Sequence, residues 1–476
     1  MGIVLHNKKG SCIICLQTLL YIRRPMKDFN IKLLDLKEED IEDIDSISHF
    51  NNADFIITLK IRPHICPTCG CITSSVKDYT TRKIKHKILV NYDTTIYYRQ
   101  RRYKCIDCGR SFVELSPFTC SRHVMSPVTV INILKDLKPY NSTYSSVAKK
   151  YDVSVSTVID IFDKHVQIPR KQLTRILCLD EFYFSRHAKK KYAFMIMDFE
   201  KKYIIDIVES RWSQDLTSYF FSIPKKEKES VRYIIIDMYK TYKDLCETFF
   251  KNATICVDPF HATKRVNDSL NAVRKRIMRS YAEHKDSQEY RLLKSRYYYI
   301  LKNRDDLDYV EYEFDPIFNA HVTDLYICDE VLKIHPDLKA AYNIKEEYIA
   351  FNDEEPHTFS GRQEKEKQLE SLMRKMMLSN IEEMKDCAKT LKNWKEEILN
   401  SFEWIDDRRL SNGPIEGKNN YIKKIISNAN GLSNFQRARN KFMYSQNLYD
   451  SYTVSESKIK VKRSGKSRGK YNKNKQ

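Results

Sequence analysis

The chain has 476 residues, a formal net charge of +20 at neutral pH and a hydrophobic content of 42%. This length exceeds what one hydrophobic core supports and predicts several domains, while the hydrophobic content excludes a globally disordered protein. No segment reaches the roughly 20 consecutive apolar residues that cross a bilayer, which excludes a transmembrane helix and a membrane partner. The positive charge favours a polyanionic partner, although a basic soluble protein of another kind would also fit.

Residues 1–60 are interpreted as an N-terminal extension followed by an acidic segment. The apolar run at residues 12–22 is too short for a membrane span, and two arginines and a proline follow it where a signal peptide would have small residues. We therefore expect the true start of the protein to be Met26. The acidic residues 26–60 are predicted to be helical.

Two Cys-x-x-Cys-Gly units predict a zinc ribbon over residues 61–120. A tight turn brings both thiolates of each unit to one side, and four sulfur atoms suit one tetrahedral, structural Zn²⁺. Residues 94–103, which are β-branched, aromatic and basic, are predicted to be a strand between the units. The predicted zinc ligands are Cys66, Cys69, Cys105 and Cys108.

Other interpretations of the cysteines are weaker. Four buried free thiols would also satisfy the pattern, and His64 or Cys71 could replace one of the four ligands. The chain has 13 cysteines, an odd number, and no secretory leader, so a disulfide framework is not expected. A further pair, Cys12 and Cys15, has apolar spacers and no glycine, and we do not expect it to bind metal.

Basic side chains beside the second unit are candidates for DNA contact. Arg101 and Arg102 lie on the predicted strand at residues 94–103 and could reach phosphates. A solvated charged strand is an equally good interpretation of either arginine alone.

Residues 121–170 change to a helical period and predict a helix-turn-helix. A first helix would contain Val147 and Ala148, and the turn would fall near residues 152–154. A second helix would then present short polar side chains to a major groove. The predicted DNA-contacting residues of this motif are Ser154, Ser156 and Thr157. An ordinary helical pair would look similar, because the motif has low specificity.

Residues 171–261 are predicted to form an α/β layer, in the order βββαβαβ. Helices are expected at residues 213–221 and 242–250. The expected strands are residues 175–179, 192–197, 203–208, 231–236 and 253–257.

The rest of the chain is predicted to be helical up to a basic tail. Residues 262–410 are long, charged and nearly free of glycine and proline, which predicts an all-helical insertion. Residues 411–450 begin with Ser411-Asn412-Gly413-Pro414, a good helix start with Asn412 as the cap. Residues 451–476 are predicted to be a disordered basic tail. The fold class is therefore a multidomain α+β chain, in which a zinc ribbon and a helix-turn-helix precede an α/β domain with a helical insertion.

Three carboxylates have the setting of a catalytic centre. Asp180 and Asp237 each end an apolar run, so buried strands would deliver both to one sheet edge. Two such carboxylates can hold a pair of Mg²⁺ or Mn²⁺ ions that support in-line attack on a phosphodiester. Glu416 fits as the third, because it lies on a polar helix face beside a stripe of isoleucines. A solvated helix face would be the alternative for that segment alone.

Two neighbouring residues compete with this assignment. Asp258 also ends an apolar run and could be a metal ligand or support one from behind. His261 could contact DNA, although a histidine in this position is more often a local structural donor.

From residue 66 to residue 444 the order of these motifs resembles the transposases of the ISL-three insertion-sequence family. The matching phrases include Leu179-Asp180-Glu181-Phe182, Asp237-Met238-Tyr239, Asp258-Pro259-Phe260-His261 and Ser411-Asn412-Gly413-Pro414-Ile415-Glu416-Gly417-Lys418-Asn419-Asn420. The resemblance implies an RNase H-like catalytic domain and a DDE triad of Asp180, Asp237 and Glu416. It also implies binding to the terminal inverted repeats of a mobile element.

We therefore expect a transposase that cleaves and joins double-stranded DNA with two divalent metal ions, as a homo-oligomer in the bacterial cytoplasm, associated with the nucleoid. A DNA-binding regulator derived from a transposase, without catalysis, is the main alternative. The intact set of carboxylates argues against it. A zinc-ribbon protein acting on RNA is a third interpretation, which the many tyrosines permit.

Overall fold

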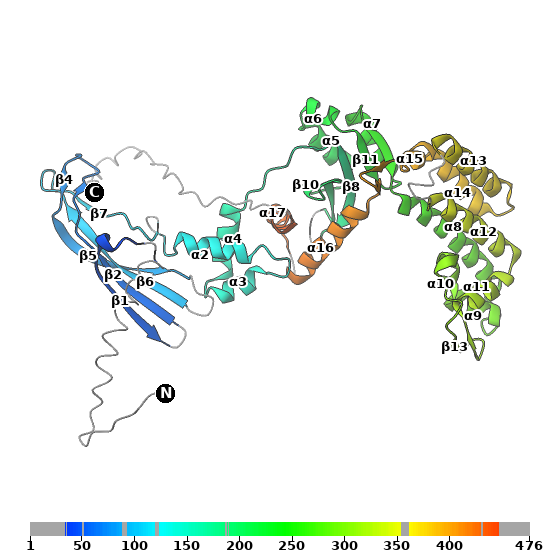
Figure 1. The fold of residues 1–476 in the computed structure, drawn as a ribbon, viewed down its shortest axis with the longest axis horizontal. Coiled ribbons are helices and arrows are strands. Elements are labelled where there is room, and N and C mark those ends of the chain that lie inside the picture. Colours follow the sequence, from blue (N-terminus) through cyan, green and yellow to red (C-terminus); the bar gives the residue numbers. More distant parts are fainter. Residues whose placement is uncertain are drawn as a thin grey trace, which may run out of the picture. The chain divides into compact units, whose positions relative to one another are not determined.

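The computed structural model describes residues 34, 36–49, 52–87, 93–119, 123–185, 188, 190–353, 361–429 and 432–446 (Figure 1). The chain divides into two compact units, one up to Gln167 and one from Ile168 to Asp450. The expected start at Met26, the Cys12 and Cys15 pair and the basic tail lie outside the described residues. Within the described ranges, no helix is both long and apolar enough to cross a membrane.

A five-stranded sheet forms most of the first unit. Its order is β1-β2-β6-β5, and β7 pairs with β6. The β2–β6 pairing is parallel and the other pairings are antiparallel. The strands are β1 (Ile41–His49), β2 (Asn52–Leu59), β5 (Val76–Lys85), β6 (Asp93–Lys104) and β7 (Ser111–Val113). The strand predicted at residues 94–103 is thus confirmed within β6.

The prediction of helix for the acidic segment is wrong over residues 41–59, which form the hairpin β1–β2. The isoleucines of β1 recur at every third position, a spacing that resembles a helix, and Ile41 and Ile44 are buried while most of the acidic side chains are exposed. A register shift between Ile41 and Asp43 brings both isoleucines opposite Leu59 and Ile57, which lie on one face of β2. The hairpin shares one sheet with β5 and β6, and the second cysteine unit lies in the turn between β6 and β7 of that sheet.

Three helices complete the first unit: α2 (Pro127–Asp136), α3 (Tyr144–Lys150) and α4 (Val155–His165). Each begins after a capping hydroxyl, from Ser126, Thr143 and Ser154 respectively. The chain reverses between α3 and α4 through Asp152, which has a φ of 46° and takes the place of the usual glycine. The predicted pair of helices and its turn are therefore present.

The second unit contains a five-stranded sheet with the order β10-β9-β8-β11-β12. The pairings β8–β9 and β9–β10 are antiparallel, whereas β8–β11 and β11–β12 are parallel. Along the chain, the order of strands and helices agrees with the βββαβαβ order predicted from the sequence, apart from an additional short helix at residues 225–229. The strands are β8 (Ile176–Tyr183), β9 (Tyr192–Asp198), β10 (Ile204–Val208), β11 (Tyr233–Ile236) and β12 (Thr254–Val257).

Helices cover both faces of this sheet. One face packs its alternate residues, such as Leu177 and Leu179, with buried residues of α5 (Ser213–Phe221) and α7 (Lys240–Phe249). The short α6 (Lys225–Glu229) lies between them in the chain. On the other face, Phe182 of β8 contacts Phe442 of α17 (Phe435–Gln446) with ring centroids 6.0 Å apart. Arg439 of α17 fixes this packing through a buried ion pair with Asp206 of β10.

Residues 259–410 form the helical part of the second unit, at the right of Figure 1. Its buried residues continue the hydrophobic core of the sheet without interruption. The helices are α8 (Pro259–Ser280), α9 (Gln288–Ser295), α10 (Tyr297–Leu301), α11 (Asp324–Lys333), α12 (Pro336–Asn352), α13 (Arg362–Leu378), α14 (Glu382–Asn393) and α15 (Lys395–Asn400).

The expectation of an all-helical insertion needs two corrections. A hairpin joins β13 (Glu313–Asp315) to β14 (Ala320–Val322), and a second joins β15 (Trp404–Ile405) to β16 (Arg408–Arg409). The second hairpin turns through two consecutive left-handed residues, Asp406 and Asp407, a conformation that tight hairpins require. It leads directly into α16 (Gly413–Ala429), whose isoleucine stripe is buried as predicted.

Candidate active site and zinc centre

Four cysteine sulfur atoms meet at one end of the first unit. Cys66 and Cys69 lie between β3 (His64–Ile65) and β4 (Ile72–Thr73), and Cys105 and Cys108 follow β6. The Cys66 and Cys108 sulfur atoms are 3.7 Å apart, and those of Cys69 and Cys105 are 3.4 Å apart. All four lie within 4.8 Å of one another. Tetrahedral zinc with a bond of about 2.3 Å would separate its sulfur ligands by about 3.8 Å, so this arrangement fits Zn²⁺.

The local backbone explains why the two units can converge. Gly70 and Gly109 both have positive φ values, 78° and 67°, which close each turn after the second cysteine. Backbone N–H groups, that of Cys69 first, lower the pKa of the Cys66 thiol to about 6, which favours a thiolate ligand. The alternative ligand His64 instead packs its ring on Tyr103, with centroids 4.7 Å apart.

The candidate catalytic carboxylates come from three neighbouring parallel strands. Asp180 lies within β8, Asp237 follows β11 and Asp258 follows β12. Because Cys178 pairs with Ile235, and Ile236 pairs with Val257, the three aspartates lie at matching levels of the sheet. Asp180 and Asp237 thus lie side by side on neighbouring parallel strands, but Asp180 lies within β8 and not, as the sequence predicted, after the end of its strand.

Asn412, which comes just before α16, joins two of these carboxylates. Its backbone N–H donates to Oδ1 of Asp258 at 3.0 Å, and its side-chain amide donates to Oδ1 of Asp237 at 3.2 Å. The same amide also reaches the carbonyl of Leu179 at 3.5 Å. Asn412 was expected to cap the helix, but its side chain is turned into the carboxylate cluster instead.

Arg409 fixes the segment that carries Asn412. Its guanidinium donates to the carbonyl and hydroxyl oxygens of Ser401 at 2.9 and 3.1 Å, and it covers the ring of Phe402 at 4.0 Å. The hairpin β15–β16 therefore holds the start of α16 against the helical part of the unit.

The α16 helix brings a second amide to the site. The side-chain amide of Asn419 donates to Oδ2 of Asp180 at 2.5 Å, and Asn419 is buried. Glu416 lies three residues earlier, nearly one helical turn, and is exposed. Burial and the charge of Asp258 are the main causes that raise the pKa of Asp237, and the charge of Glu416 adds to them. Asn419 thus contacts the cluster directly, while Glu416 lies at its open side.

His261, in the first turn of α8, completes the cluster. Its Nε2 atom is 3.1 Å from Oδ1 of Asp237 and 4.0 Å from Oδ2 of Asp258. The three residues could hold one metal ion, since one ligand atom of each lies within 4.8 Å of the others. The chain opens beside them into a hollow of about 330 Å³, lined by Met238, His261, Lys264, Arg265, Asp268 and Thr390.

Burial and mutual repulsion raise the pKa of these carboxyls above that of exposed carboxyls, so they stay protonated up to a higher pH. Burial, and then the charge of Asp237, raises the pKa of Asp180 to about 7. Burial, and then the charge of Asp258, raises the pKa of Asp237 to about 7. Burial likewise raises the pKa of Asp258. The protein's own groups leave the negative charges of this cluster poorly neutralised, so a bound cation would stabilise it.

Oxygen atoms without donors support the same conclusion. Oδ2 of Asp258, Oδ1 of Asn412 and Oδ1 of Asn419 are buried and accept no hydrogen bond from the described residues. Buried acceptors of this kind are normally satisfied, and oxygen is the ligand that Mg²⁺ prefers. The residues present therefore fit a divalent cation.

Two known protein families match parts of this chain. The ISL3 family of DDE transposases matches residues 177–442, more than half of the chain. The chain belongs to this family. The zinc finger of the transposases of IS204, IS1001, IS1096 and IS1165 matches residues 62–108, which contain all four cysteines of the cluster.

A curated relative agrees with the family assignment. The transposase for insertion sequence element IS1001 from Bordetella parapertussis is 23% identical over 249 residues, 51% of this chain. The match covers 60% of that relative's length.

One predicted DNA contact of this ISL3-family chain is corrected by the structure. Arg101 is completely buried, with its Nε atom 3.9 Å from Oε2 of Glu114, so it cannot reach a phosphate. It alternates with Arg102 along β6, and only one face of that strand meets solvent. Arg102 is half exposed and forms an ion pair with Asp78.

The three predicted contacts of the helical pair lie at the start of α4. Ser154 and Ser156 are exposed, and Thr157 is partly exposed. The Ser154 hydroxyl accepts from the backbone N–H of Thr157 at 3.1 Å and is 2.8 Å from the hydroxyl of Ser156. Ser154 therefore caps the helix, whatever else it contacts.

Sequence reasoning missed the roles of two asparagines. The sequence predicts that Asn412 is a helix cap and assigns no separate role to Asn419. The structure buries Asn419 and leaves Asn420 exposed. Helical spacing alone could not separate them, since positions three and four residues after Glu416 share its face.

Proposed function

We propose that the chain is a DNA transposase that cleaves and joins DNA strands at the terminal inverted repeats of an insertion sequence, using divalent metal ions. The observation that carries this proposal is the meeting of Asp180 and Asp237, on neighbouring parallel strands, with the helix that bears Glu416. The sheet order, with its antiparallel β8–β9–β10 side and parallel β8–β11–β12 side, supports an RNase H-like domain.

Asp180, Asp237 and Glu416 would hold the metal ions, with Mg²⁺ or Mn²⁺ as the ions expected from oxygen ligands. Bound there, two such ions supply activation of the attacking oxygen and stabilisation of the leaving oxygen. The deprotonated carboxylates that bind metal are favoured near and above pH 7, because two of these carboxyls have a pKa of about 7.

The other residues of the cluster would orient these ligands. Asn419 fixes one oxygen of Asp180, and Asn412 fixes one oxygen of Asp237. His261 can donate to Asp237, and Asp258 holds the backbone of Asn412 in place. Fixing ligand oxygens in this way makes the site more rigid and its metal affinity higher.

The first unit would recognise the DNA. Its α3–α4 pair has the lengths and tight turn of a helix-turn-helix, and exposed hydroxyl groups stand at the start of α4. Arg102 would add a phosphate contact. Since transposition acts on two element ends, we expect two or more copies of the chain in the active complex.

The decisive experiment compares Glu416→Gln with a matched control, Glu382→Gln, whose side chain is 76% exposed at the start of α14. Nicking of a labelled duplex with the element's own end is measured with Mg²⁺ and without added divalent ion, and binding to the same duplex is measured in parallel. Omitting Mg²⁺ is preferable to a chelator, because a chelator could also remove zinc from the cysteines.

Metal-dependent nicking that is lost in Glu416→Gln but kept in the control, with unchanged binding, is the expected result. Equal nicking by both variants would remove Glu416 from the triad and direct attention to Asp258, which faces the same cluster. Firm binding without nicking by any form, in an assembled paired-end complex, would favour the non-catalytic regulator.

A further inference from the structure

One end of the helical part carries a charge opposite to that of the whole chain. Residues 304–347 contain twelve aspartates and glutamates but only four lysines and arginines, in a chain of net charge +20. They comprise η2 (Arg304–Asp306), the hairpin β13–β14, α11 and most of α12. A surface this acidic repels DNA phosphates, so this end does not clamp DNA.

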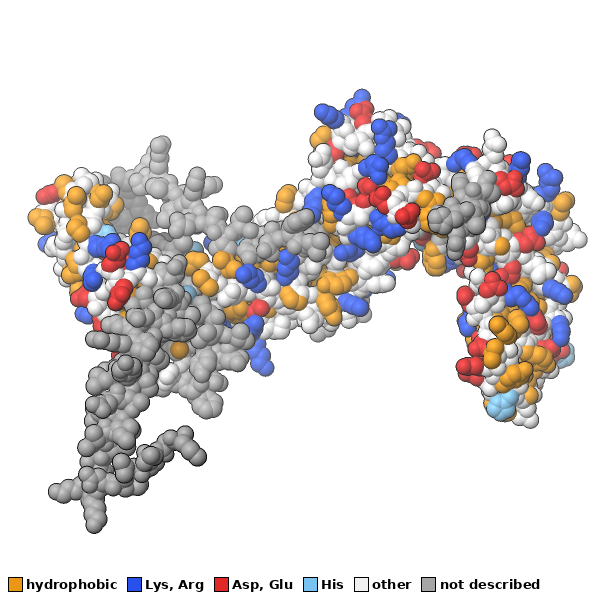
Figure 2. All heavy atoms as spheres, in the orientation of Figure 1, with side chains coloured by type: hydrophobic (Ala, Val, Ile, Leu, Met, Phe, Trp, Pro, Cys, Tyr) orange, Lys and Arg blue, Asp and Glu red, His pale blue; other side chains and the backbone are white. Residues whose placement is uncertain are grey.

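The same end displays large hydrophobic side chains. Tyr309, Val310, Tyr312 and Phe314 are 72%, 67%, 67% and 55% exposed, and we call these four residues the hairpin patch. Figure 2 shows hydrophobic side chains gathered at the end of the helical part where Figure 1 labels β13. Single exposed apolar residues are ordinary, but a contiguous group rimmed by charge marks a protein-binding surface.

The hairpin patch is held in a fixed shape. Oδ1 of Asp308 accepts the backbone N–H groups of Val310 and Glu311 at 2.7 and 2.8 Å, which fixes the loop that precedes β13. Asp315 at the end of β13 forms an ion pair of 2.5 Å with Arg296. A surface ordered before binding loses little conformational entropy on association.

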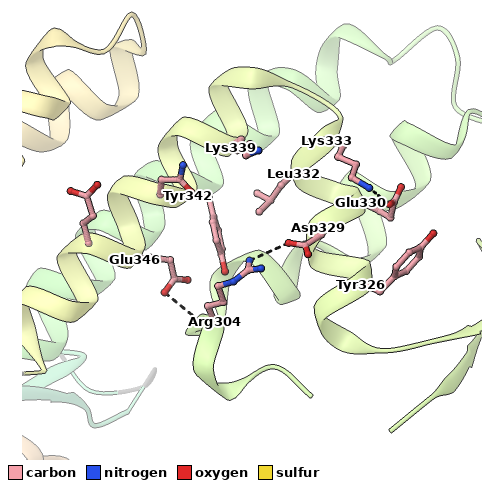
Figure 3. A pocket seen from close by; sticks show the side chains of 11 residues that line it. Arg304, Tyr326, Asp329, Glu330, Leu332, Lys333, Lys339, Tyr342 and Glu346 are labelled. Carbon is pink, nitrogen blue, oxygen red and sulfur yellow. Dashed lines mark hydrogen bonds and ion pairs between the residues drawn. The ribbon is translucent and has the colours of Figure 1, made fainter. Parts of the chain in front are cut away.

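A groove of about 700 Å³ is lined by residues of α11 and α12 together with Arg304 (Figure 3). Arg304 stands in it and forms a 3.1 Å ion pair with Asp329, and Tyr326 and Tyr342 contribute aromatic walls. Tyr326 also packs against Phe318 of the β13–β14 loop, with ring centroids 5.6 Å apart. The groove therefore adjoins the β13–β14 hairpin, and that hairpin carries Phe314 of the hairpin patch.

We propose that this surface binds a second copy of the chain, so that the hairpin patch of each copy contacts a basic surface of the other. The charges are complementary, since the rest of the chain carries all of the positive surplus. Two hairpin patches facing each other would instead bring like charges together. The choice of a second copy rests on the proposed function, because joining two DNA ends requires at least two copies.

The test uses the full-length chain and three variants. Tyr309→Ser with Tyr312→Ser removes the two most prominent rings, and Asp305→Lys with Asp306→Lys reverses charge beside them. Leu378→Ser is the control, since Leu378 is 77% exposed on a different helix, at the end of α13. Mass in solution is measured by light scattering over a range of concentrations and salt, and a photo-crosslinking residue at position 309 identifies what the patch contacts.

We expect the wild type and Leu378→Ser to self-associate, and both other variants to shift the dissociation constant at least tenfold towards monomer. The crosslink should join position 309 to a Lys- or Arg-rich peptide of a second copy. Unchanged self-association in the two patch variants would overturn the proposal, as would a wild type that stays monomeric over the whole range of concentrations and salt. Because neither measurement involves DNA cleavage, a failure of this proposal can be distinguished from a failure of the proposed catalytic function.

Discussion

Asn419→Ala and Asn420→Ala form a matched pair that tests whether α16 orients the catalytic carboxylate. The two residues are identical and adjacent, but only Asn419 is buried and donates to Asp180. A hydrogen bond to a charged group contributes about 1.5–3 kcal/mol. At about 1.4 kcal/mol per factor of ten, its loss corresponds to about a 10- to 140-fold weaker binding of metal at Asp180. This range overlaps the effect usual for residues that orient metal ligands.

Two measurements check this prediction. The Mg²⁺ or Mn²⁺ concentration that gives half-maximal nicking of an element-end duplex should rise in Asn419→Ala and stay at the wild-type value in Asn420→Ala. The melting temperature without added divalent ion separates this effect from unfolding, since a merely destabilised variant would melt earlier but keep its metal dependence. Equal metal dependence in the two variants would refute the reasoning that the 2.5 Å contact orients the ligand.

Three further predictions concern zinc, pH and DNA contact. Cys69→Ser should lose the bound zinc and loosen the first unit, whereas Cys71→Ser should keep one equivalent, as measured by metal analysis and limited proteolysis. Asp180 and Asp237 have pKa values of about 7 in the folded chain, above the unfolded value of about 3.9. The protonated carboxyls therefore contribute to the stability of the fold in full below about pH 4, and this contribution is lost as the pH rises through 7. Thermal stability without added Mg²⁺ should therefore fall over that window, and Mg²⁺ should restore it at pH 8 but not at pH 5. Arg102→Ala should reduce the salt dependence of DNA binding by about one phosphate contact, whereas Arg101→Met should change stability and leave that slope unaltered.

The regular elements of the second unit could be predicted from the sequence because local patterns determine them. Strands that are buried on both faces of a sheet appear as continuous apolar runs, and such runs matched β8 to β12 in order. The two Cys-x-x-Cys-Gly units were equally informative, since the chemistry of four thiolates and the glycine turns needs little tertiary context. Where local cues were ambiguous, as in the acidic residues 41–59, the choice of helix was wrong, because strand pairing with β6 decides that segment.

The sequence by itself determined the family-typical carboxylates, the cysteine units and the order of the elements. Only the tertiary structure decided which neighbours those residues have. In the folded chain Asn419, and not Asn420, contacts the carboxylate of Asp180, and the Asn412 side chain points into the carboxylate cluster. Arg101 is buried while Arg102 is exposed. These are choices between adjacent or chemically similar residues, and they depend on contacts between segments up to 239 positions apart in the chain. Composition and periodicity predict on which face of a helix or strand a residue lies, whereas tertiary packing determines which atoms that residue contacts.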